Sequence, residues 1–211
     1  MPGQLHPFDQ SSYQVRFEWG ADGLARLAPS DIVVVVDVLR FSSTVVQSLE
    51  RGEPVALDAS AHAVSLNGAA VAAAASGLVL LGALRNRASV ARAILAEQER
   101  RGARTSVAVI ACGELTSQAP AGLRFAVEDL LGAGAVIDAL AELGIDHSSP
   151  EAAVAGEGFR SLRGAATHLL TASASGRELE EIGRRADVIA AAAVDAASVV
   201  PVLRDGVFVA L

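Results

Sequence analysis

Lysine is absent from this chain of 211 residues, because all 17 basic residues are arginines. Its absence excludes a Schiff-base lysine and the lysine of a P-loop. The chain has one cysteine, Cys112, so it forms no intrachain disulfide, and a reducing compartment fits best. An excess of basic charge is also lacking, since 24 acidic residues give a formal net charge of −7. This balance argues against binding to nucleic acid or to an anionic membrane surface, which would need a basic face.

Long hydrophobic runs suited to a membrane span or a signal peptide are also missing. The N-terminal residues have no apolar core of the signal-peptide type. Residues 63–84 carry no charge, but they include Ser65, Asn67 and three glycines, and they read as loop, helix and strand. We therefore expect a cytoplasmic protein that binds no membrane.

The proportions of hydrophobic and charged residues favour a single folded domain. Hydrophobic residues make up 52% of the chain and charged residues 19%, which excludes a disordered chain and favours a large core. Neither a linker nor a repeat divides the sequence, so residues 1–211 are expected to form a single domain. The oligomeric state is left open, a homo-oligomer included.

Strand-like and helix-like patterns alternate along the chain. Residues 32–38 (IVVVVDV) are a β-branched run typical of a strand buried on both faces. Apolar residues at helical spacing between Ala126 and Leu140 predict an amphipathic helix. Further strands are expected at 13–19, 55–57, 78–81, 106–111 and 199–211, and further helices at 42–49, 68–75, 88–101, 150–170 and 177–185. The predicted fold class is α/β, with three α/β/α layers around a mostly parallel, mixed sheet.

The chemistry is expected where the buried strands end, because ligands of such sheets bind beyond the carboxyl ends of the strands. Asp37 and Arg40 follow the most apolar run, and Ser42, Ser43 and Thr44 open the next helix. A carboxylate at a buried strand end is costly unless it meets a cation, and a helix start attracts anions. An Asp37–Arg40 ion pair with a serine helix cap explains the same residues equally well.

Three other junctions carry polar residues or a thiol. Asn86 follows a strand, and a plain helix cap is the favoured interpretation of its position. Cys112 follows another strand and is typical of a small core residue without a zinc partner. Glu128 and Asp129 fall in the first turn of a helix, where acids also complement the dipole. The four histidines share no spacing that suggests a metal site or a catalytic triad.

In combination, the order of these motifs resembles the 2-phosphosulfolactate phosphatase (ComB) family. The matching segments are Asp37 to Thr44 (DVLRFSST), Ser65 to Gly68 (SLNG), Gly82 to Asn86 (GALRN), Ala111 to Gly113 (ACG), Glu128-Asp129, and Ser175 to Leu179 with Asp187, Asp195 and Val200-Pro201. The resemblance implies an α/β/α fold and Mg²⁺-dependent hydrolysis of 2-phosphosulfolactate to sulfolactate and phosphate, a step of coenzyme M biosynthesis. The expected partner is thus a small anionic phosphate ester.

The resemblance also assigns roles to individual residues. Asp37 and Glu128 are the expected Mg²⁺ ligands, since Mg²⁺ prefers one or two carboxylates with waters and substrate oxygens. Arg40 and Asp129 complete the catalytic set, and Asp37 is either a metal ligand or a covalent nucleophile. The residues expected to bind substrate are Ser42, Ser43, Thr44, Asn67 and Asn86.

One segment departs from the family pattern. The family carries a stretch with a glutamate and an asparagine before the Asn-Gly motif, and here only residues 58–64 fill that gap. We expect a shallower, wetter site, weak activity on 2-phosphosulfolactate and little discrimination against simpler phosphate monoesters. The alternative is a non-catalytic homologue that binds anions and has lost turnover.

Overall fold

A seven-stranded mixed sheet forms the centre of the computed structural model, which describes residues 6–58, 67–115 and 122–211. Its order is β1-β5-β2-β4-β8-β9-β3. The parallel part consists of β1 (Val15–Trp19), β5 (Val107–Ala111), β2 (Ile32–Val36) and β4 (Leu78–Gly82). The antiparallel part consists of β8 (Pro201–Arg204), β9 (Val207–Ala210) and β3 (Val55–Ala56).

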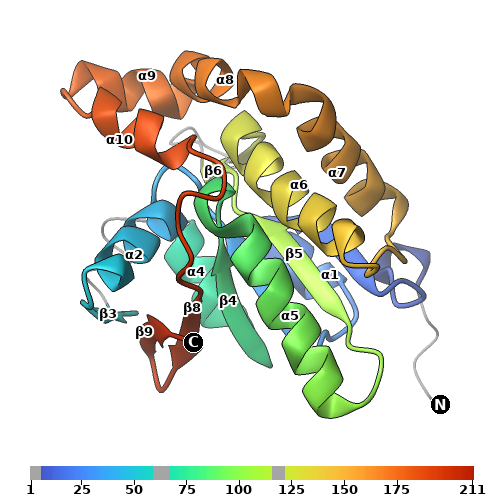
Figure 1. Cartoon of the computed structure of the whole chain (residues 1–211). Coiled ribbons are helices and arrows are strands. Elements are labelled where there is room, and N and C mark those ends of the chain that lie inside the picture. Colours follow the sequence, from blue (N-terminus) through green and yellow to red (C-terminus); the bar gives the residue numbers. More distant parts are fainter. Residues whose placement is uncertain (1–5, 59–66, 116–121) are drawn as a thin grey trace.

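Helices cover both faces of this sheet, which confirms the predicted three-layer α/β/α class (Figure 1). One face packs against α5 (Arg87–Arg101), α6 (Val127–Glu142) and α7 (Pro150–Leu162). The other packs against α1 (Gly20–Arg26), α2 (Phe41–Glu50) and α4 (Gly68–Ala74). A row of short helices, α8 (Ala166–Ala172), α9 (Ala174–Glu181) and α10 (Arg185–Ala191), lies at the top of Figure 1. No described helix is long and apolar enough to cross a membrane.

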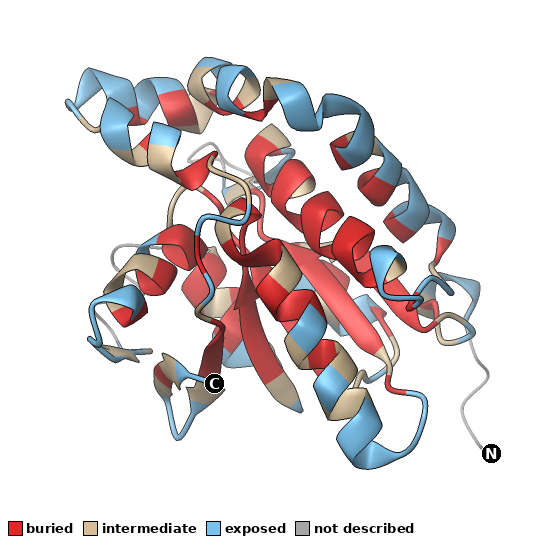
Figure 2. Cartoon of the chain, viewed as in Figure 1, coloured by how far each residue is buried: buried red, intermediate tan, exposed pale blue. Residues whose placement is uncertain are grey.

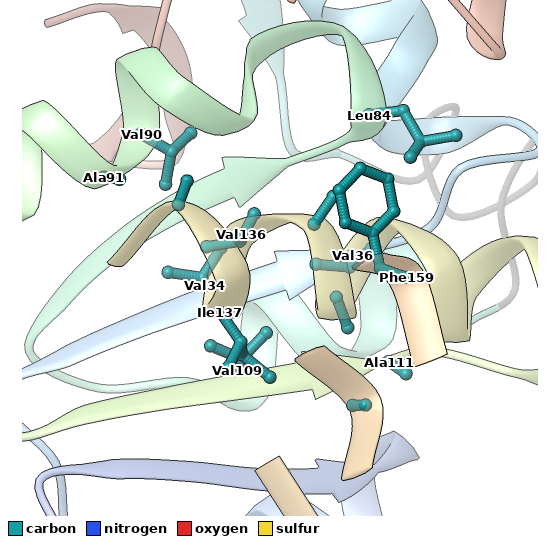
Figure 3. Packing of buried hydrophobic residues seen from close by; sticks show 14 of the residues in the cluster. Val34, Val36, Leu84, Val90, Ala91, Val109, Ala111, Val136, Ile137 and Phe159 are labelled. Atoms are coloured by element: carbon teal, nitrogen blue, oxygen red, sulfur yellow. The ribbon is translucent and has the colours of Figure 1, made fainter. Parts of the chain in front are cut away.

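Strand β2 shows why a β-branched run suits the centre of such a sheet. All five of its residues are buried, and the alternation of a strand divides them between the two faces. Val34 and Val36 contribute to the core beneath α5 and α6, whereas Val33 and Val35 contribute to the core beneath α2 and α4. The packing on the first face includes Phe159 of α7 (Figure 3), and the buried residues form a continuous band through the sheet (Figure 2). Because both faces of this strand are apolar, the polar residues next to it in sequence lie before its first residue and after its last.

Most predicted elements are present, with three differences. Helix α1 and the small hairpin of β6 (Glu114–Leu115) and β7 (Leu123–Arg124) were not predicted. The helical segment expected over 150–170, with some glycine interruption, is divided into α7 and α8 by a 3₁₀ turn, Arg163–Ala165, that contains Gly164. Helix α1 contains two glycines, and the strands of the hairpin are only two residues long, so none of them gives a clear periodic pattern in the sequence.

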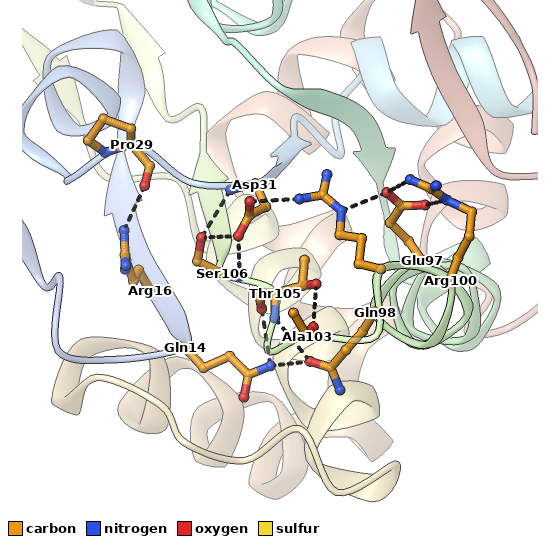
Figure 4. Close-up of polar contacts among 11 residues, drawn as sticks. Gln14, Arg16, Pro29, Asp31, Glu97, Gln98, Arg100, Ala103, Thr105 and Ser106 are labelled. Carbon is orange, nitrogen blue, oxygen red and sulfur yellow. Dashed lines mark hydrogen bonds and ion pairs between the residues drawn. The ribbon is translucent and has the colours of Figure 1, made fainter.

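The amino end of the parallel strands is closed by paired polar side chains (Figure 4). Asp31, just before β2, accepts hydrogen bonds from the backbone N–H and the hydroxyl of Ser106, just before β5. The Asp31 Oδ1 to Arg101 Nη1 distance is 2.6 Å. Arg16 donates to the carbonyl of Ala28. Hydrogen bonds and an ion pair therefore use the polar side chains at this end of the sheet, and the residues predicted to form the active site lie at the opposite end.

Candidate active site

An acidic cleft of about 450 Å³ lies beyond the carboxyl ends of β2 and β5. Its lining brings together five predicted residues that are distant in sequence: Asp37, Arg40, Asn67, Glu128 and Asp129. Five carboxylates line it in total, because Glu114 of β6 and Glu178 of α9 also contribute. The only guanidinium in this lining, within the described residues, is that of Arg40.

Asp37 is held by the turn that joins β2 to α2. Its backbone N–H donates to the Ser42 hydroxyl at 3.0 Å, and its carbonyl accepts from the Ser42 N–H at 2.8 Å. Its Oδ1 accepts from the N–H of Phe41, the first residue of α2, at 3.1 Å. The Asp37 carboxylate itself therefore occupies part of the helix start that the sequence suggested for a phosphoryl group. The turn fixes a carboxylate at the floor of the cleft.

Asp129 connects the two strand ends that bound the cleft. Its Oδ1 accepts the N–H of Val38, after β2, at 2.7 Å, and its Oδ2 accepts the N–H of Gly113, after β5, at 2.9 Å. Burial raises the pKa of the Asp129 carboxyl well above its ordinary value, and the charges of Asp37 and Glu128 add to the effect. These two hydrogen bonds act in the opposite direction. Asp129 thus orders the backbone around Asp37 and Gly113.

Asn67 and Gly68, the Asn-Gly pair, close the cleft from the side of α4. Asn67 Nδ2 donates to the Gly113 carbonyl at 2.6 Å, while its buried Oδ1 has no hydrogen-bond partner among the described residues. A Cβ on Gly68 would lie 2.6 Å from Asp37 Oδ2, closer than side-chain carbons approach. Gly113 has φ of +64°, which favours glycine, and its Cβ would lie 2.8 Å from the Arg124 carbonyl oxygen. Both glycines are explained by close approach at the cleft.

Helix α9 supplies residues that sequence reasoning did not assign to the site. The Ser175 hydroxyl donates to Glu128 Oε1, which fixes a carboxylate that is only 3% exposed. Glu178, Leu179 and Ile182 also line the cleft. The Ser-Gly-Arg-Glu-Leu run belongs to the family resemblance, but only the tertiary contacts, such as the Ser175–Glu128 hydrogen bond, reveal which of its residues reach the site.

Arg40 is the cation available to an anionic ligand here. Its side chain makes no ion pair with any other described residue, in contrast to Arg85 and Arg87, which pair with Glu50 and Asp138. The alternative of an Asp37–Arg40 ion pair is therefore wrong. An unpaired guanidinium beside a cleft can bind two oxygens of a phosphoryl group at once.

Several residues predicted to bind substrate lie elsewhere. Ser42 is fully buried, and its hydroxyl donates to the Val35 carbonyl, so it braces the turn and is not part of the cleft lining. Ser43 donates to the Val38 carbonyl, and it lines a separate hollow with Thr44. Asn86 is fully buried, and its amide donates to the carbonyls of Leu81 and Val199. Its polar atoms are used within the fold, because a buried amide must find backbone partners.

Cys112 conforms to the interpretation as a core residue. It is fully buried in the cluster beneath α2 and α4. Burial raises the pKa of its thiol well above the ordinary value, and the charges of Asp37 and Asp129 act in the same direction. The thiol is thus kept protonated and is a poor nucleophile.

The oxygen donors of the cleft fit a hard divalent cation. No group of three or more His, Cys, Asp or Glu side chains in the described parts of the chain forms a ready metal cage. Mg²⁺ does not need one, since it is usually bound by one or two carboxylates with waters and phosphate oxygens. Such a donor set is supplied by the carboxylates of Asp37 and Glu128 and by Asn67 Oδ1, which has no hydrogen-bond partner in the described part of the chain. A cation would also offset the repulsion among the buried acids.

Comparison with protein families decides the class of this chain. The family model for 2-phosphosulpholactate phosphatase matches residues 58–206. The chain belongs to this family. It is therefore an enzyme of the phosphatase class, and the matched range contains Asn67, Glu128 and Asp129, whereas Asp37 and Arg40 precede it. A search of curated proteins found no match. Of the shortened segment only Asp58 is described, and residues 59–64, like Ser65 and Leu66 of the motif, lie outside the described residues.

Proposed function

We propose that this protein is a cytoplasmic, Mg²⁺-dependent phosphoric monoester hydrolase that converts 2-phosphosulfolactate and water to sulfolactate and phosphate. The step would serve coenzyme M biosynthesis, as the family resemblance implies. The observation that carries the proposal is that Asp37, Glu128 and Asp129 line one cleft with Arg40, which forms no ion pair among the described residues, in a chain from this family.

Charge is the physical reason to expect a metal. The cleft lining has five carboxylates and one guanidinium, and the substrate carries phosphate, sulfonate and carboxylate groups. Like charges at short range in a partly desolvated site repel strongly, so the substrate would not bind these residues alone. A divalent cation held by Asp37 and Glu128, with Asn67 Oδ1, would offset part of this negative charge at the place where the phosphoryl group binds.

The chain's own residues then divide the remaining tasks. When bound, Mg²⁺ supplies charge neutralisation and polarisation of the phosphoryl oxygens. The Arg40 guanidinium binds phosphoryl oxygens in a fork, and Ser175 keeps Glu128 in place through its hydrogen bond. Asp129 is a positioning residue, because both of its oxygens accept backbone N–H groups that shape the cleft. Asp37 is either a metal ligand or the attacking carboxylate, and the two roles differ in whether a phosphoenzyme can be trapped.

A phosphate-release assay tests the proposal. The purified protein is incubated with 2-phosphosulfolactate and with a panel of other phosphate monoesters, with Mg²⁺ and with a chelator. We expect Mg²⁺-dependent release of phosphate that the chelator abolishes and that added Mg²⁺ restores. Binding of phosphate and Mg²⁺ without turnover of any monoester would contradict the proposal and support the non-catalytic homologue.

A further inference from the structure

A second, smaller hollow of about 190 Å³ lies between α10 and the side of α2, from Arg40 to Arg51. Three of the chain's arginines line it: Arg40, Arg51 and Arg184. Asp187 is the only carboxylate of this lining among the residues that the structure describes. We call this hollow the basic cavity, and it is unusual in a chain with a net charge of −7.

The arginines of the basic cavity keep unused donors. Arg184 Nε bonds to Asp187 Oδ2 at 2.6 Å, and its two terminal nitrogens have no partner within the described chain. Arg51 directs Nε and Nη2 to Glu53, which leaves Nη1 without a described partner. Arg40 forms no ion pair within residues 6–58, 67–115 and 122–211. Guanidinium groups with free, planar donors suit an oxyanion such as a carboxylate or a sulfonate.

The basic cavity and the acidic cleft are neighbours. Leu39 and Arg40 line both hollows, so these two residues form the wall between them. In Figure 1, α10 lies next to α2, and α9, which lines the acidic cleft, precedes α10. A ligand with one acidic group in each hollow would therefore have to extend past Leu39 and Arg40 only.

We propose that the basic cavity binds the non-reacting acidic group of the substrate, a sulfonate or a carboxylate, while the phosphoryl group lies in the acidic cleft. This inference rests on the proposed function. It assigns Arg184 and Arg51 as specificity residues and gives Thr44, which lines the same cavity, a place near the substrate. It also changes one expectation from the sequence: the protein should favour phosphate esters with a second acidic group, even with a shortened middle segment.

Kinetics on a graded series of substrates test the proposal. 2-Phosphosulfolactate carries a sulfonate and a carboxylate, 2-phospholactate carries only the carboxylate, and isopropyl phosphate carries neither. For Arg184→Gln and Arg51→Gln, we expect kcat/KM for 2-phosphosulfolactate to fall about tenfold relative to isopropyl phosphate, mainly through KM. Arg185→Gln is the matched control, because Arg185 is adjacent in sequence, pairs with Glu180 and does not line the cavity.

The series also identifies the oxyanion. An equal loss for 2-phospholactate assigns the carboxylate to the basic cavity, and a loss confined to 2-phosphosulfolactate assigns the sulfonate. An unchanged ratio in both the Arg184 and the Arg51 variants, with melting temperatures like the parent protein's, would overturn the proposal.

A binding measurement separates this inference from the proposed function. Sulfoacetate, which has both acidic groups and no phosphate, is titrated into the protein by calorimetry. We expect binding to the parent protein and to Arg185→Gln, and about tenfold weaker binding to Arg184→Gln. This result would stand even if no phosphate ester were hydrolysed. Equal sulfoacetate affinity in all three proteins would refute the subsite whatever the outcome of the hydrolysis assay.

Discussion

At the scale of single residues, the acidic cleft depends on where the Asp37 carboxylate lies. The turn after β2 and the absence of a side chain on Gly68 together leave room for it. The position of the Asp37 carboxylate thus depends on the Asn-Gly pair, which lies 30 residues later in the sequence. A residue without any functional group can therefore control the site.

Gly68→Ala tests this dependence. Its new methyl group would lie 2.6 Å from Asp37 Oδ2 and 2.7 Å from Phe41 Cδ1, so the carboxylate or the ring must move. A displaced catalytic group costs roughly a hundredfold in rate, and we expect a loss of that order in kcat/KM. Gly164→Ala, where nothing lies within 4 Å of the new carbon, is the control. Full activity of Gly68→Ala would show that Asp37 need not occupy this position.

The sequence predicted part of the site because strand ends in a parallel sheet meet at one edge. Asp37, Arg40 and the Glu128-Asp129 pair follow clear apolar runs or open a clear helix, and all of them line the cleft. The sequence could not separate Asn86 from Asn67, since both are asparagines near a helix start. Only the tertiary contacts show that the Asn86 amide donates to the carbonyls of Leu81 and Val199, whereas Asn67 Oδ1 has no partner among the residues that the structure describes.

At the scale of elements, the close contact between α6 and α7 places Glu128 and Asp129. Ala155 of α7 packs directly over Gly134, where a Cβ would lie 2.1 Å from the Ala155 carbonyl oxygen. The two helices can approach only because position 134 has no side chain. The glycines of α6, which weaken an isolated helix, are thus required by packing.

A pair of glycine substitutions tests this packing. Gly134→Ala should lower the free energy of unfolding by about 1–3 kcal/mol, because the helices must separate. Gly158→Ala in α7, where the new carbon meets nothing within 4 Å, should raise it by about 0.5–1 kcal/mol through helix propensity alone. Urea unfolding of both variants gives the two values. Changes of the same sign would contradict the packing argument.

The elements with a regular apolar pattern were predictable, whereas α1 and the β6–β7 hairpin were not. The β-branched run of β2 and the apolar spacing of α6 give strong local signals. By contrast, α1 begins at Gly20 with φ of +61° and contains a second glycine, so its local signal is weak. Helix α9 was expected near its true position, but its place over the cleft results from long-range packing that periodicity does not encode.

At the scale of the whole molecule, the two ends of the parallel sheet differ in how their charges are satisfied. At the amino end, hydrogen bonds from Ser106, followed by the charge of Arg101, lower the pKa of the Asp31 carboxyl. At the carboxyl end, the acids are buried side by side. One end therefore stabilises the fold, and the other is arranged to receive a ligand.

The amino end should contribute stability that depends on pH. A lowered pKa in the folded state means that the Asp31 contribution is present above its unfolded pKa, about 4, and is lost as the pH falls through the folded value. Asp31→Asn should therefore cost about 1 kcal/mol near neutral pH, a value kept small by solvent screening, and less at a pH well below about 4. Asp205→Asn, in the exposed β8–β9 turn, is the control. A cost that does not vary between the two pH values would argue against this role.

We expect the hydrolysis of phosphate esters by this protein to require both Mg²⁺ and the Asp37 carboxylate. The most direct measurement is phosphate release from 2-phosphosulfolactate as a function of Mg²⁺ concentration, for the parent protein, Asp37→Asn and Asp205→Asn. We predict that Asp37→Asn loses at least about a hundredfold in turnover while it keeps the parent's circular dichroism spectrum, and that Asp205→Asn behaves as the parent. Hydrolysis by Asp37→Asn with the parent's rate and the parent's Mg²⁺ dependence would contradict the claim.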